Sequence, residues 1–294
     1  LELWDPPGLP PGTTEGDRER RGRILSKLRD ADAYVLVVRD FRSDLYPYER
    51  PERDPKGDLA RLIDEMVTSD FVIAEKRAEK LRESVLKKTK TADEDKTELS
   101  VLERCLECFE AGEDLAELEI DDLTEKRIRS YQFFTRKPML VLVNGPDEAP
   151  ADFAAGTAIR MRGVASMDAQ IDAELNAMDA EDRPTFMEEF GIEAPAADRF
   201  VRDVYAGVGL LSFFTVGEDE VRAWTIRAGD NAVTAAGKIH TDLARGFVRA
   251  EVFPHEDLID AGGMRELKAR GGIRLEPKDY VVQDGDIVHI RSAV

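Results

Sequence analysis

Two short apolar runs, far apart in the chain, constrain its fold most strongly. Tyr34–Val38 reads YVLVV and Met139–Val143 reads MLVLV, and neither run alternates with polar residues. A strand that is apolar on both faces is typical of a parallel sheet covered on both sides. The second run ends at Asn144-Gly-Pro-Asp147, and ligands bind at the carboxyl ends of such strands. The sequence therefore predicts an α/β domain whose functional loops lie at that edge.

The sequence between these runs has a helical period instead. In residues 58–134, apolar positions recur every three to four residues among charged ones, and Gly112 can end a helix. Thr91-Ala-Asp-Glu94 resembles a capping box, which would start the second helix. We expect an antiparallel, coiled-coil-like helical hairpin inserted into the α/β domain. An ordinary helical subdomain without a binding role is the alternative.

The last part of the chain has a third sequence pattern, with short β-rich segments separated by Gly-containing turns. Predicted strands fall in residues 213–215, 221–226, 247–252 and 287–291. A small mixed α+β domain therefore closes the chain. The expected boundaries are 1–57 and 135–204 for the α/β domain, 58–134 for the helical insertion and 205–294 for the last domain.

Composition excludes several classes of protein. The chain has 42 Lys and Arg against 61 Asp and Glu, a net charge of −19, which disfavours broad binding to nucleic acid. No apolar run is long enough to span a bilayer, so no membrane role is expected. The two cysteines, Cys105 and Cys108, have no second pair, which excludes a disulfide scaffold and fits the cytoplasm. Core packing is the favoured role for both thiols.

Two short motifs carry the chemistry. Asp5-Pro-Pro-Gly8 has the Asp-x-x-Gly pattern, in which the Asp of P-loop proteins reaches magnesium through water and the Gly amide meets the γ-phosphate. Asn144 and Asp147 follow a predicted strand and could present an amide and a carboxylate to the edge of a purine base. A helix cap or Asx turn is the alternative for this second motif.

Five longer segments make the pattern specific: Phe213–Thr215, Glu220–Ile226, Ala235–Asp242, Arg245–Phe247 and Lys278–Asp286. With them the chain resembles the YchF/Obg-like ATPase family, and these segments look like that family's C-terminal TGS domain. The resemblance implies a translation-associated NTPase that binds the ribosome and hydrolyses ATP or GTP with Mg. It also implies the helical insertion.

The resemblance gives the motifs their roles. Asp5, Gly8 and Leu9 would lie on the phosphate and magnesium side, with Leu9 where other P-loop proteins place a water-orienting Gln. Asn144, Asp147 and Ser166 would lie on the base side, because Ala165-Ser166-Met167 stands where the family places its last base-contacting loop.

The chain also departs from the family in ways that bear on activity. No Gly-x-x-x-x-Gly-Lys-Ser/Thr occurs, and that loop supplies the phosphate cradle. The chain as given is therefore expected to be inactive and to hold Mg-nucleotide only with a further N-terminal segment. Such a segment is favoured because Leu1 is not Met and the residues before Asp5 read as a strand. A degenerate relative is the alternative.

Two further departures concern hydrolysis and base choice. The family has a catalytic His after its Val-Val-Arg-x-Phe segment, whereas residues 42–56 contain Tyr46 and Tyr48 and no His. Asp147 replaces the family's usual Glu, which leaves ATP and GTP open. The alternative function is a non-catalytic ribosome- or protein-binding module that uses the TGS domain and the hairpin.

Overall fold

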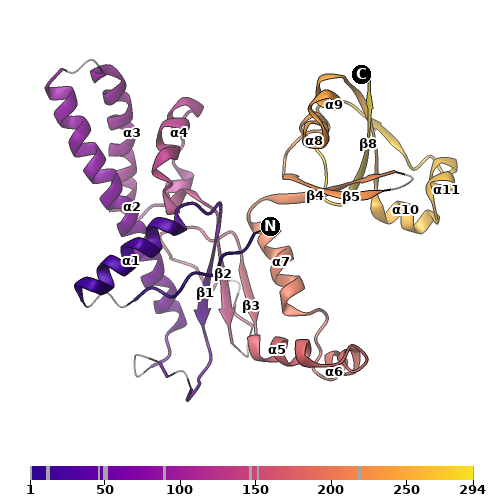
Figure 1. Cartoon of the computed structure of the whole chain (residues 1–294), viewed down its shortest axis with the longest axis horizontal. Helices are drawn as coiled ribbons and strands as arrows, with labels where there is room; N and C mark the ends of the chain where they lie inside the picture. The colour runs from indigo at the N-terminus through magenta and orange to yellow at the C-terminus, as the bar shows by residue number, and fades with distance from the viewer. Residues whose placement is uncertain are drawn as a thin grey trace. The chain divides into compact units, whose positions relative to one another are not determined.

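A computed structural model describes residues 2–10, 14–45, 47–48, 52–88, 91–145, 148–150, 152–217 and 220–293. The chain divides into two compact units, Leu1–Val204 and Tyr205–Val294 (Figure 1), and each has its own hydrophobic cores. No helix within these ranges combines the length and apolar character that a bilayer-spanning helix needs.

The first unit is built on a three-stranded parallel sheet in the order β1-β2-β3. Strand β1 (Tyr34–Arg39) and strand β2 (Met139–Asn144) confirm the two predicted strands, and β3 (Val164–Met167) adds the third. Every residue of β2 from 139 to 143 is buried, as its apolar run predicts. The α/β class with a parallel sheet is therefore confirmed.

Helices in the first unit begin and end at local signals. Helix α1 (Glu15–Leu28) starts with a capping box, in which the Thr14 hydroxyl accepts from Asp17 N at 3.1 Å. Helix α2 (Pro55–Leu86) starts with Asp54 as its N-cap and Pro at its first position. Helix α3 (Ala92–Ala111) ends at Gly112, whose φ of 68° is the left-handed conformation that glycine adopts easily.

The predicted capping box at Thr91 is wrong. The Thr91 side chain makes no capping hydrogen bond to the backbone and donates instead to the Asp95 carboxylate at 2.9 Å. Its φ of −99° and ψ of 6° depart from the extended conformation that aims an N-cap side chain at the first turn. The Ser/Thr-x-x-Glu pattern alone does not set this backbone geometry.

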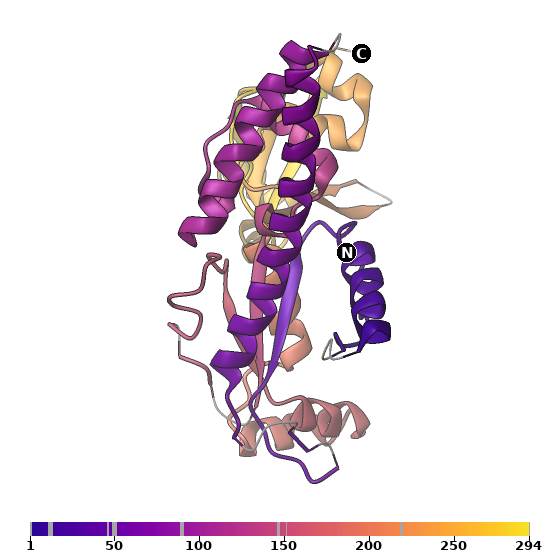
Figure 2. The ribbon, with the colours of Figure 1, turned by 90° about the vertical axis from the view of Figure 1, so that its left-hand side faces the viewer.

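Helices α2 and α3 lie side by side (Figure 1 and Figure 2). Their shared core consists of small and medium side chains: Ala74, Ala78 and Leu81 from α2, with Val101, Leu102, Cys105 and Cys108 from α3. The alanines allow the two helices to approach closely. The expectation that both cysteines serve core packing is confirmed.

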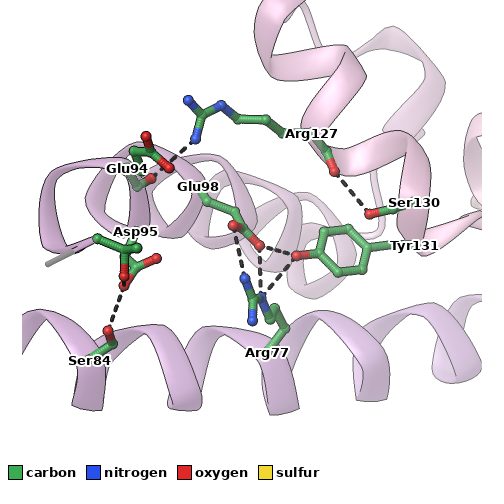
Figure 3. Close-up of polar contacts among 9 residues, drawn as sticks. Arg77, Ser84, Glu94, Asp95, Glu98, Arg127, Ser130 and Tyr131 are labelled. Atoms are coloured by element: carbon green, nitrogen blue, oxygen red, sulfur yellow. Dashed lines mark hydrogen bonds and ion pairs between the residues drawn. The ribbon is translucent and has the colours of Figure 1, made fainter. Parts of the chain in front are cut away.

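A polar cluster fastens the segment after α3 to this helix pair (Figure 3). The Arg77 guanidinium donates to both carboxylate oxygens of Glu98, at 2.8 and 3.0 Å, and to the Tyr131 hydroxyl at 3.1 Å. Tyr131 also donates to Glu98. Burial and the Glu98 hydrogen bond raise the pKa of Tyr131 to about 12, so it stays a donor. Tyr131 ends η2 (Arg129–Tyr131), which follows α4 (Asp122–Ile128).

The remaining elements of the first unit flank the strands. Short 3-10 turns η1 (Leu115–Glu117) and η3 (Phe134–Arg136) precede β2. Three helices follow β3: α5 (Ala169–Ala177), α6 (Arg183–Glu189) and α7 (Ala196–Gly207).

The second unit is a five-stranded mixed sheet in the order β5-β4-β8-β6-β7. Strands β4 (Leu210–Val216), β5 (Val221–Arg227), β6 (Phe247–Pro254) and β8 (Asp286–Ser292) confirm the four predicted strands, and β7 (Arg274–Glu276) joins one edge. Four helices pack with it: α8 (Ala232–Ile239), α9 (Thr241–Arg245), α10 (His255–Ala261) and α11 (Met264–Ala269). Separate apolar clusters centred on Phe213 and Phe253 hold this unit together.

Candidate functional site

The carboxyl ends of β1, β2 and β3 lie next to one another. Arg39 pairs with Asn144, and Asn144 pairs with Met167. The residues that leave the sheet at this edge are therefore Asp40, Gly145 and the residue after Met167. Parallel α/β sheets bind ligands at this edge, so the predicted base-side motif lies where such a site belongs.

Asn144 ties the three strand ends together. Its Oδ1 accepts from the backbone N–H of Ala169, the first residue of α5, at 3.1 Å, and its carbonyl oxygen accepts from Asp40 N at 2.6 Å. The Asn144 amide nitrogen has no hydrogen-bond partner among the described residues. The expected helix-cap role and a ligand-binding role are thus compatible, because the side-chain oxygen bonds to the fold while the amide nitrogen has no partner among the described residues.

Gly145 fills a position with no room for a side chain. A Cβ built on it would lie 2.6 Å from the Asp40 carbonyl oxygen and 2.9 Å from Asp40 Cβ. Its backbone N–H donates to the carbonyl of Met167 at 2.9 Å. A side chain at residue 145 would therefore require the Asp40 backbone to shift. Pro146 and Asp147 lie outside the described residues.

Ser166 lies on strand β3, and its expected placement in a loop is wrong. It pairs with Val143 across the sheet, and the chain turns only after Met167, where Asp168 caps α5. The Ser166 hydroxyl accepts from Ala149 N at 2.8 Å, which holds the segment after β2 beside β3.

A cavity of about 200 Å³ lies beside Ser166 and is lined also by Glu148, Arg199, Phe200 and Asp203. Small-molecule pockets usually enclose about 300–1,000 Å³. This cavity is therefore too small to enclose a whole nucleoside triphosphate, although it lies next to the candidate base-side residues.

In the part of the chain that the structure describes, no hydrogen bond or ion pair links the Asp5 motif to this edge. Residues 2–10 have no regular secondary structure, so the expected strand before Asp5 is wrong. Asp5 and Gly8 are exposed, whereas Leu9 packs partly buried against the sheet core. Within the described ranges Asp5 makes no hydrogen bond or ion pair, and no cluster of three metal-binding side chains occurs. Among the described residues, the apolar packing of Leu9 anchors this segment.

The predicted site residues did not include Arg39, the cation at the end of β1. The Arg39 guanidinium lies between two rings, 4.5 Å from the centre of Phe41 and 4.4 Å from that of Tyr48. Tyr48 donates its hydroxyl to the Arg39 carbonyl, and burial raises the pKa of that hydroxyl. One guanidinium nitrogen, Nη2, is buried without a partner in the described chain. Tyr46 lies outside the described residues.

An ion pair between Arg53 and Asp40 links the two ends of the segment after Arg39. Arg53 Nε lies 3.1 Å from Asp40 Oδ1, and Arg53 Nη1 donates to the Asp40 carbonyl at 2.9 Å. Tyr48 and Arg53 therefore hold this segment against the ends of β1 and β2. With its hydroxyl committed to donation and its pKa raised, Tyr48 cannot serve as a general base near neutral pH.

Comparison with known proteins places these features in context. Residues 210–293 match the family model YchF-GTPase_C, described as a protein of unknown function, DUF933. The chain is 34% identical over 307 residues to the ribosome-binding ATPase YchF of Bacillus subtilis, an alignment that covers 100% of this chain and 82% of the relative. It is also 34% identical over 296 residues to the protein of that name from Escherichia coli O157:H7, covering 98% and 80%.

The fold has a counterpart among solved structures. The Schizosaccharomyces pombe YchF GTPase superposes with a TM-score of 0.74 at 27% sequence identity, over 91% of this chain and 74% of that one. The similarity therefore extends beyond the C-terminal segment that the family model matches.

Proposed function

We infer that this chain, which belongs to the YchF family, binds the ribosome. We also propose that it binds a purine nucleotide at the carboxyl edge of its parallel sheet. The observation that carries this proposal is identity of 34% over the full chain to a protein named as a ribosome-binding ATPase. A ribosome partner fits a cytoplasmic protein. The position of Asn144 at the meeting point of three strand ends supports the nucleotide site.

We assign the site residues as follows. The base side consists of Asn144, Asp147 and Ser166. From its position on β3, Ser166 contributes by holding the segment after β2 in place. Asp5, Gly8 and Leu9 belong to the phosphate side, where Asp5 would reach Mg through water. Magnesium would neutralise phosphate charge there. An exposed Asp5 on a segment without regular structure is compatible with ordering on ligand binding.

The proposed domains follow the expected boundaries. Residues 1–57 and 135–204 form the nucleotide-binding domain, 58–134 a coiled-coil-like insertion and 205–294 a TGS domain. The division of the chain after Val204 and the family-model match at 210–293 support the last boundary. The packing of α2 against α3 supports the hairpin.

Ribosome binding is tested by co-sedimentation of the purified chain with 70S ribosomes through a sucrose cushion. We expect a saturable fraction in the pellet that depends on ribosome concentration. A chain that stays in the supernatant at micromolar ribosome concentration would refute the proposal. The same experiment with added ATP, GTP or neither separates a nucleotide-dependent protein from the second candidate, a non-catalytic ribosome-binding module.

For residues 1–294 by themselves, the second candidate predicts weak nucleotide binding, because they contain no Gly-x-x-x-x-Gly-Lys-Ser/Thr sequence. Without these backbone amides and the Lys, base contacts alone give weak affinity. We expect calorimetry with ATP or GTP to detect no binding to this chain at micromolar concentration. A micromolar or tighter dissociation constant would mean that other residues, Arg39 among them, hold the phosphates.

Base preference depends on Asp147. A carboxylate there accepts from the N1 and exocyclic amino groups of guanine, whereas adenine presents a lone pair at N1. An unsatisfied buried hydrogen-bonding group costs about 1–3 kcal/mol, or roughly ten- to hundred-fold in affinity. We expect GTP to compete better than ATP in any form of the protein that binds nucleotide. Equal competition, or stronger competition by ATP, would show that Asp147 does not read the base.

A further inference from the structure

Helix α2 runs through both hydrophobic cores of the first unit, and a buried carboxylate lies where it passes from one to the other. Its core-facing residues are Leu59, Ile63 and Met66 in the sheet core, then Ala74, Ala78 and Leu81 in the hairpin core. Asp70 occupies the position between these two sets and has 0% of its surface exposed. Helical spacing would place an apolar residue there, and a buried charge is costly unless it is paired.

Both carboxylate oxygens of Asp70 are engaged by other segments. Oδ1 accepts from Arg29 Nη1 at 2.6 Å, and Oδ2 accepts from the backbone N–H and the hydroxyl of Thr135, each at 2.9 Å. Arg29 also donates to Ser69 Oγ at 2.7 Å and to the carbonyl of Gln132 at 3.0 Å. Three segments therefore meet at one carboxylate: the end of α1, the middle of α2 and the approach to β2.

The surrounding contacts hold these segments in one arrangement. The Arg29 guanidinium lies 4.1 Å from the centre of the Phe134 ring, and Arg21 on α1 forms a second link to α2 through Glu65 at 2.8 Å. Gln132, whose carbonyl faces Arg29, has a φ of 51°, a conformation that few residues other than glycine adopt. The chain therefore bends at Gln132, next to Arg29, where it runs from the hairpin back toward β2.

We propose that Arg29, Asp70 and Thr135 form a joint that sets the direction in which the hairpin leaves the sheet and makes the hairpin move with α1. Apolar contacts are non-directional and allow helices to slide, whereas an ion pair with four further hydrogen bonds has one geometry. Buried ion pairs often add less stability than apolar residues of the same size, and fixing register is their best-attested use. This role goes beyond the proposed function, since it needs neither nucleotide nor ribosome.

The test separates orientation from stability. In the full chain, spin labels on Ser26→Cys in α1 and Lys80→Cys in α2 report the distance distribution between α1 and the hairpin by pulsed electron resonance. Both positions are exposed, whereas the native Cys105 and Cys108 are buried. The parent without added cysteines measures background labelling.

We expect the double variant Arg29→Met/Asp70→Leu to stay folded with a lowered unfolding midpoint, because the buried Thr135 N–H loses its acceptor, while the distance distribution broadens at least about twofold. The matched control is Arg82→Gln/Glu103→Gln, which removes an exposed α2–α3 ion pair of 3.0 Å and should leave the width unchanged. An unchanged width in the folded double variant overturns the proposal.

A second variant covers the case in which the double variant fails to fold. Thr135→Val removes one hydrogen bond to Asp70 Oδ2 and keeps the shape of the side chain. It should broaden the distribution more than the surface control Arg82→Gln/Glu103→Gln does. A lower midpoint without broadening would assign the cluster a purely structural role and would overturn the joint.

Discussion

Gly145 is the position at the carboxyl edge where one added carbon has the clearest predicted effect. In Gly145→Ala the new Cβ would lie 2.6 Å from the Asp40 carbonyl oxygen. Relieving this overlap requires a backbone shift of about half an ångström or more. Asp40 cannot move freely, because its N–H donates to Asn144 O at 2.6 Å and its carbonyl accepts from Arg53 at 2.9 Å.

The magnitude follows from this constraint. Overpacking of a tight site costs about 1–3 kcal/mol, and the gain from replacing Gly in the unfolded chain offsets about 0.5–1 kcal/mol of it. We therefore expect Gly145→Ala to lower the free energy of unfolding by about 1–2 kcal/mol. Gly145→Lys, which creates the Asn-Lys-x-Asp pattern, should cost at least as much.

Gly22→Ala is the matched control. Gly22 lies inside α1, and a Cβ there would meet no atom within 4 Å, so this change should stabilise the chain by about 0.5–1 kcal/mol. Urea unfolding followed by far-ultraviolet circular dichroism gives both values. A Gly145→Ala midpoint equal to or above that of the parent, with Gly22→Ala behaving as expected, would refute the steric argument.

We expect three further results for side chains of the helix pair α2 and α3. Hydrogen bonds from Arg77 lower the pKa of Glu98, so its stabilising contribution is present at neutral pH and is lost as pH falls through that lowered value. The difference in unfolding free energy between the parent and Glu98→Gln should shrink toward zero in acid urea titrations. Burial raises the pKa of Cys105 to about 11, so a thiol reagent at pH 8 should label it only after denaturation; rapid native labelling would contradict its burial. Leu102→Ala, at 0% exposure, should cost about 3–5 kcal/mol in the same unfolding assay, whereas Leu86→Ala, at 81% exposure, should cost under about 0.5 kcal/mol; equal costs would refute the assigned core.

Short sequence patterns predicted the strands and helix ends well where a single cause, burial or one backbone conformation, sets the structure. Continuous apolar runs identified β1 and β2, and Gly112 marked the end of α3, since these depend on burial or on one backbone conformation. Patterns that require a particular backbone geometry were less reliable. Thr91 matched a capping motif without making its bond, and the residues before Asp5 read as a strand that the structure does not contain.

The candidate site shows the same division. Sequence motifs selected Asn144 and Ser166 as candidates but not Arg39, because the contacts of its guanidinium with Phe41 and Tyr48 exist only in the folded chain. Ser166 was assigned to a loop, since nothing in its own neighbourhood shows that it pairs with Val143.

The sequence by itself determined the family, the α/β class and the order of strands and helices, because these follow from residue order and from hydrophobic periods within single segments. The tertiary structure alone decided why Gly145 cannot carry a side chain and why Asp70 can be buried. The partners of Asp70 lie 41 and 65 residues away along the chain. A buried charge is tolerated only when such distant donors converge on it, and that convergence exists only once both hydrophobic cores have formed.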